Sequence, residues 1–111
     1  MVRADDPHLH SPHIVCPAAL SQANLAPLER QVDQAVLRKP ECVCIDLSGV
    51  QAAESTGLEW LISTQSRLAT TGIRMVLNAP SPLMVDVLAA TRLDHRFQVE
   101  LQPAPAGAVN G

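Results

Sequence analysis

Residues 41–58 read ECVCIDLSGVQAAESTGL, and this stretch decides the fold. It begins with a short apolar run from Cys42 to Ile45, bounded by polar residues, which is typical of a buried strand. From Leu58 onward the apolar residues recur at helical spacing. The segment 54–57 (ESTG) therefore lies where a strand has ended and a helix begins. Ligands and partners of open α/β sheets are usually met at the carboxyl ends of the strands, so function is expected here.

The rest of the chain alternates between the same two patterns. Strands are predicted at about 13–16, 42–47, 73–77 and 97–101, and helices at about 25–37, 55–70 and 83–90. Strands alternating with helices imply parallel pairing through right-handed crossovers. We therefore expect one α/β domain over residues 13–101, with about four mostly parallel strands and three to four helices. A flexible arm over 1–12 and a disordered, Pro/Ala/Gly-rich tail over 102–111 are expected to flank it.

Turn and capping residues mark where these elements end. Ser81 followed by Pro82 is a strong helix start, with serine as N-cap and proline at the first helical position. Gly72 suits the residue just beyond a helix end, and Asn24 suits an N-cap. Asp46 and Ser48 follow the central strand at a turn, where we expect them to shape the loop.

Composition excludes several classes of function. Apolar residues make up 47% of the 111 residues, and the formal net charge is −3, without a basic patch for nucleic acid. No apolar stretch is long enough to cross a membrane, and the first residues lack the apolar core of a signal peptide, so a cytoplasmic protein is expected. Three cysteines without metal-ligand spacing read as small buried hydrophobes, so neither a metal nor another cofactor is expected.

Catalytic motifs are missing from the sequence. There is no P-loop and no GxSxG elbow, and the acidic and lysine positions of a response-regulator receiver are not filled. Near the central loop the polar candidates are Asp46, Glu54, Ser55 and Thr56, with no histidine or lysine close in sequence. Catalysis needs converging acids, bases and nucleophiles, so we expect a protein that is not an enzyme.

Ser55 permits two interpretations. In the first it is an N-cap that satisfies one backbone N–H and has no other role. In the second it is a phosphorylation switch, because a phosphate at a helix start meets free N–H groups and the positive end of the helix dipole. Such a phosphate would change the surface that a partner meets without unfolding the domain.

Four segments, in their order and spacing, resemble the STAS domain, the family of anti-sigma factor antagonists and of sulphate-transporter C-terminal domains. They are IDLSGV (45–50), ESTGL (54–58), GIRMVL (72–77) and Ser81-Pro82 with Leu88 and Leu93. In the family the second segment begins with Asp rather than Glu54, and its first serine is phosphorylated by a partner anti-sigma kinase. Carried over, that position is Ser55.

The resemblance implies a domain that binds a protein partner, and it leaves three hypotheses. The first is an anti-sigma factor antagonist that binds a serine kinase of the anti-sigma type while Ser55 is unphosphorylated. The second is a non-phosphorylated subunit that regulates the ATPase of a phospholipid-transport ABC system or belongs to a chemotaxis-linked complex. The third is a small-molecule or nucleotide-binding domain that uses the helix start.

The predicted partner surface continues along the second helix. Thr56, Trp60 and Arg67 are expected on one face, roughly opposite the Leu61 and Leu68 stripe. Exposed tryptophan and arginine are common interface anchors, whereas the alternative is a tryptophan that folds over a helix edge. With Glu54, Ser55 and Gly57, these residues form the predicted partner-binding set.

Overall fold

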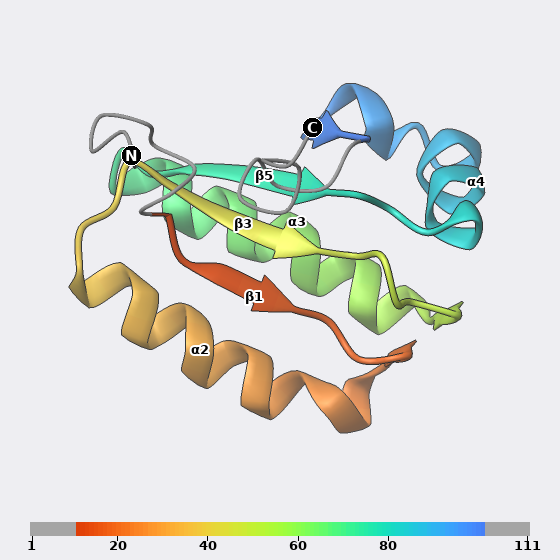
Figure 1. The fold of residues 1–111 in the computed structure, drawn as a ribbon, viewed down its shortest axis with the longest axis horizontal. Coiled ribbons are helices and arrows are strands. Elements are labelled where there is room, and N and C mark those ends of the chain that lie inside the picture. Colours follow the sequence, from red (N-terminus) through yellow and green to blue (C-terminus); the bar gives the residue numbers. More distant parts are fainter. Residues whose placement is uncertain (1–10, 102–111) are drawn as a thin grey trace, which may run out of the picture.

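The computed structural model describes residues 11–101 as a four-stranded sheet with helical crossovers (Figure 1). The predicted tail, and the predicted arm apart from residues 11 and 12, lie outside the described residues. The strands are β1 (His13–Val15), β3 (Cys42–Asp46), β5 (Arg74–Asn78) and β6 (Gln98–Glu100), all parallel in the order β1-β3-β5-β6. The crossovers carry helices α2 (Leu25–Leu37), α3 (Ser55–Thr70) and α4 (Pro82–Ala90). The predicted α/β fold is confirmed, with strand ends that differ from the prediction by a residue or two.

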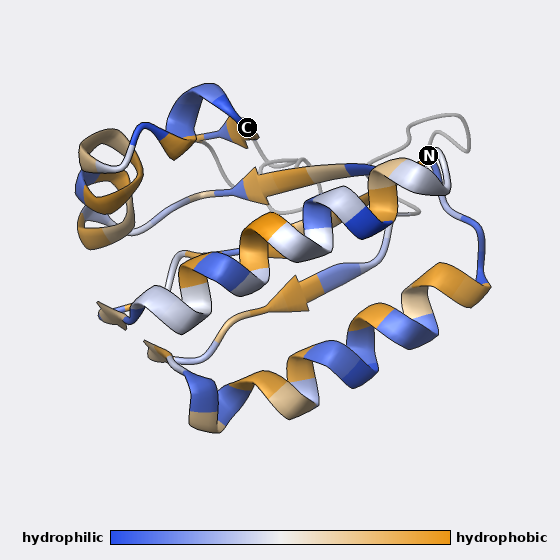
Figure 2. Cartoon of the chain, turned by 180° about the vertical axis from the view of Figure 1, so that it is seen from behind, coloured by the Kyte–Doolittle hydropathy of each residue, from blue (hydrophilic) through white to orange (hydrophobic). Residues whose placement is uncertain are grey.

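Helices α2 and α3 cover one face of the sheet, as the view from behind shows (Figure 2). Strand alternation turns Val43 and Ile45 of β3, with Leu77 of β5, toward these helices, where all three are fully or almost fully buried. Helix α4 and the 3-10 helix η2 (Leu93–His95) lie near the β5–β6 edge (Figure 1). The core is therefore an aliphatic layer between the sheet and two helices.

The opposite face of the sheet carries a smaller buried cluster. It consists of Cys42 and Cys44 on β3 with Val76 on β5. The two cysteines share a face and are buried, as their spacing predicts. Burial raises the pKa of the Cys44 thiol, and likewise that of Cys16 in the main core, to about 12. These thiols therefore behave as small apolar groups.

Two short strands were not predicted. Strands β2 (Ala19–Leu20) and β4 (Ala52–Ala53) pair in parallel beside the main sheet. Each has two residues, and alanine favours neither strand nor turn strongly enough to give a pattern. Their pairing continues into a hydrogen bond of 3.0 Å from the Glu54 N–H to the Leu20 carbonyl. This hydrogen bond holds the loop between β3 and α3 against β2, immediately before α3 begins.

Helix ends follow the predicted signals at two of three places. The Ser81 side chain accepts from the Met84 N–H at the start of α4, and Gly72 has a φ of +78° just after α3. Asn24 occupies the N-cap position of α2, at the end of the 3-10 helix η1 (Gln22–Asn24), but makes no capping bond. Its amide instead donates to the Ala19 carbonyl at 2.8 Å, so its side chain fastens β2.

Candidate functional site: the first turn of helix α3

Ser55 is the first residue inside α3, and the N-cap is Glu54. Glu54 has extended backbone angles, φ −99° and ψ 164°, and its side chain makes no capping bond. The N-cap interpretation of Ser55 is therefore wrong, because the chain turns into the helix one residue earlier. The Ser55 side chain is exposed, and its hydroxyl has no hydrogen-bond partner among residues 11–101.

Two backbone donors are open beside this hydroxyl. The N–H groups of Gly57 and Leu58 both donate to the Glu54 carbonyl, at 3.0 and 3.1 Å. Those of Ser55 and Thr56 find no acceptor within the described part of the chain. Open N–H groups carry the positive end of the helix dipole, so this turn attracts negative charge. The exposed Glu54 carboxylate beside it has the opposite effect on an incoming anion.

Thr56 differs from its neighbour in accessibility. Its Oγ1 is buried and has no hydrogen-bond partner in the structure. A buried hydroxyl of this kind is costly, because it has lost water without gaining a protein partner. Of the two adjacent hydroxyls, only that of Ser55 faces solvent where another protein could reach it.

Gly57 is buried and belongs to the packing of this turn. A Cβ at this position would lie 2.4 Å from the Leu20 carbonyl oxygen and 2.7 Å from Leu20 Cγ. The helix start therefore approaches β2 more closely than any side chain allows. The predicted partner contact at Gly57 is corrected accordingly: the residue is needed for the close approach of two backbone segments. Sequence reasoning missed this because β2 was not predicted.

Asp46 and Ser48 stabilise the turn after β3. The Asp46 carboxylate accepts a hydrogen bond from the Ser48 N–H at 2.8 Å, a local arrangement that favours a turn. Asn78 lies opposite Asp46 in the β3–β5 register. It is 2% exposed, and in the described part of the chain neither its amide nitrogen nor its amide oxygen has a hydrogen-bond partner.

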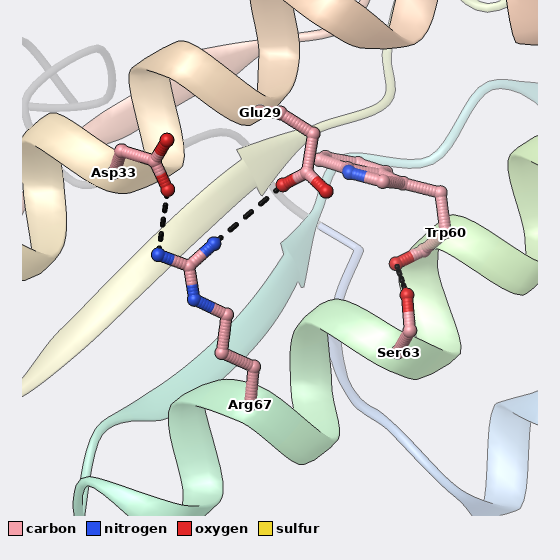
Figure 3. Close-up of polar contacts among 5 residues, drawn as sticks. All are labelled: Glu29, Asp33, Trp60, Ser63 and Arg67. Carbon is pink, nitrogen blue, oxygen red and sulfur yellow. Dashed lines mark hydrogen bonds and ion pairs between the residues drawn. The ribbon is translucent and has the colours of Figure 1, made fainter.

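Trp60 lies in the core, so its predicted exposure is wrong. It is 4% exposed and projects from α3 toward α2 (Figure 3). It packs in the main cluster with Leu28 and Val32 of α2. Helix α3 contacts both the sheet and α2, and so buries a wider arc than the one stripe expected from its apolar spacing. Within residues 11–101 the indole N–H has no hydrogen-bond partner.

Arg67 links the two helices. Its Nη2 lies 2.6 Å from Asp33 Oδ1 and its Nη1 lies 3.6 Å from Glu29 Oε1, both carboxylates belonging to α2 (Figure 3). The Arg67 side chain is 43% exposed, so water still reaches the group. Its guanidinium is thus already engaged within the domain, on the flank of α3 that faces α2. The structure does not gather Trp60, Arg67 and Ser55 into one exposed surface.

Comparison with known proteins identifies the family. A family model described as "Mlab, STAS domain" matches residues 5–103. This chain belongs to the STAS domain family. STAS domains generally mediate protein–protein interactions, so membership indicates a regulatory, protein-binding role. No curated protein matches the chain. Over residues 11–101, no helix is long and apolar enough to cross a membrane, and no three His, Cys, Asp or Glu side chains cluster as a metal site.

Proposed function

We propose that this STAS domain regulates a protein partner by presenting the first turn of α3, and that phosphorylation of Ser55 releases the partner. The domain acts by binding and not by catalysis. The partner in this proposal is an anti-sigma factor with serine kinase activity, which makes the protein an anti-sigma factor antagonist. The observation that carries the proposal is the exposed, unpartnered Ser55 hydroxyl at a helix start, next to a threonine whose hydroxyl is buried.

The first turn of α3 is suited to carrying a phosphate without unfolding. A phosphate adds about 1.5 to 2 negative charges at neutral pH. The open N–H groups of Ser55 and Thr56 and the positive end of the helix dipole stabilise such a charge. A partner that fits the uncharged hydroxyl would have to desolvate the phosphate, which costs several kcal/mol unless it supplies a counter-charge. The free domain therefore keeps its stability while the complex loses its own.

A second candidate is a subunit that regulates the ATPase of a phospholipid-transport ABC system without being phosphorylated. The exposed Glu54 carboxylate favours it, because this residue already places a negative charge beside Ser55 and opposes a second one.

The test is affinity purification of partners from native extract, using the full chain and mass spectrometry. The variants are Ser55→Ala, Ser55→Asp and Ser63→Asp, the last adding the same charge at another exposed serine of α3. We expect a kinase of the anti-sigma type to be retained by all but Ser55→Asp, and incubation with that kinase and ATP to place phosphate on Ser55. Recovery of an ABC ATPase that binds Ser55→Asp as well as wild type would replace this proposal with the second candidate.

A further inference from the structure

A cavity of about 630 Å³ lies at the other end of α3 from Ser55. It is bounded by the last turns of α3, by the start of β5 and by the residues that lead into β6. Strand β6 pairs only with the segment 76–78 of β5, so Arg74 and Met75 extend beyond it. The space beside these two residues is left without a strand, and this is how the cavity forms. Its volume is in the usual range for small-ligand sites, about 300–1,000 Å³.

The charged side chains that line the cavity are both arginines. Arg74 comes from β5 and Arg96 from the segment before β6, and no carboxylate of residues 11–101 lines the space with them. The acidic residues nearest to Arg96 in sequence, Asp94 and Glu100, do not belong to the lining. The cavity therefore carries an excess of positive charge, although the whole chain has a net charge of −3.

These two guanidinium groups have donors to spare. Arg74 Nη1 lies 3.4 Å from Gln98 Oε1, and Arg96 Nη2 lies 3.5 Å from Ser66 Oγ. Both contacts are long, and a guanidinium has five N–H donors. Neither arginine forms an ion pair with any residue between 11 and 101, whereas Arg67, on the same helix as Ser66, has two carboxylate partners.

Beside the polar side chains of Gln65, Ser66 and Gln98, the cavity has apolar lining residues, and part of its backbone is held in place. Ile73 and Met75 are 6% and 4% exposed and line it with Ala69 of α3. The Gln65 amide donates to the Arg96 carbonyl at 3.0 Å, which ties the segment before β6 to α3. The site thus combines an apolar wall with two cationic groups on a fastened backbone, the usual composition of a small-ligand pocket.

We propose that this cavity binds a small organic anion, with its carboxylate or phosphate held by Arg74 and Arg96 and an apolar body against Ile73 and Met75. The site is separate from the proposed switch. The 16 residues of α3 span about 24 Å at 1.5 Å per residue, and Ser55 is at the far end. The two proposals are therefore independent: disproving phosphorylation at Ser55 would not disprove anion binding, and disproving anion binding would not disprove the switch.

The test is an NMR titration of the ¹⁵N-labelled full chain with four probes of equal chain length: hexanoate, hexyl phosphate, hexylamine and 1-hexanol. We expect saturable shifts at the amides of Gly72, Ile73 and Arg96 with the two anions, and at least about ten-fold weaker binding of the amine and the alcohol, since only the anions form charge-assisted hydrogen bonds with the guanidinium groups. The anion that binds more tightly shows whether the site prefers a carboxylate or a phosphate.

Arg74→Gln and Arg96→Gln should each weaken anion binding about ten-fold, because each removes one charged donor set. Arg30→Gln is the matched control: it deletes the same charge at an exposed position of α2 outside the cavity, and should leave binding unchanged. The spectra themselves report whether each variant is folded. Equal binding of hexylamine, the absence of any saturable shift, or full binding by the Arg74→Gln/Arg96→Gln double variant would overturn the proposal.

Discussion

The two ends of helix α3 are built in opposite ways. At the amino end Gly57 packs directly on Leu20, and what reaches solvent is a serine hydroxyl with open backbone N–H groups and the Glu54 carboxylate. At the carboxyl end the neighbouring strand stops short, and a cavity with two arginines remains. In our two proposals, the amino end binds a protein partner at its surface, while the carboxyl end takes a small ligand into its cavity. One helix can thus carry two separate recognition chemistries, depending on how tightly its neighbours close around each end.

The largest effect is expected from Trp60→Ala, which removes the large side chain that joins α3 to α2. Truncating a buried aromatic residue costs about 3–5 kcal/mol of unfolding free energy. Urea denaturation of the variant measures this loss. The wild type offers a second test, since Trp60 is the only tryptophan. Its fluorescence emission should be blue-shifted and should not be quenched by acrylamide. A loss below about 1 kcal/mol would mean that this half of α3 is loosely held.

A smaller effect is expected from Gly57→Ala, which tests the close contact at the amino end. The added Cβ meets a backbone oxygen and Leu20 Cγ, so the start of α3 must shift, and overpacking of this kind costs about 1–3 kcal/mol. Gly49→Ala is the control, because a Cβ there meets nothing within 4 Å and should leave stability unchanged or slightly higher. Thermal melts compare the two. Equal melting temperatures of Gly57→Ala and Gly49→Ala would contradict the close contact between Gly57 and Leu20.

The smallest effect is expected from Arg67→Gln, which removes the ion pairs between α3 and α2. Because the arginine is half-exposed, the loss should be about 0.2–1 kcal/mol and should shrink as salt is added. Denaturation at low and high ionic strength measures it. A loss that does not change with salt would place the contribution of Arg67 in the packing of its aliphatic stem and not in its charge.

The elements that could be predicted are those whose signals are local. Apolar periodicity placed the four main strands and three helices, and Ser81 and Gly72 marked helix ends, because caps depend on a few adjacent residues. Trp60 and Gly57 were misjudged because their surroundings come from α2 and β2, which lie 20 or more residues away in the chain. The start of the helix at Ser55 was predicted, whereas the interpretation of Ser55 as its N-cap was off by a single residue. The cavity at the far end was not predicted, since it depends on where β6 stops relative to β5.

The buried thiols have a consequence for chemistry in the cell. Oxidants and alkylating agents attack the thiolate, and a pKa of about 12 leaves Cys16 and Cys44 almost entirely protonated at neutral pH. Cys42 is completely buried beside Cys44 on the same face of β3 and is shielded by its position. Peroxide at concentrations that modify exposed, ionised cysteines would therefore leave these three side chains unchanged. The fold thus protects its cysteines from reactions that require an accessible thiolate.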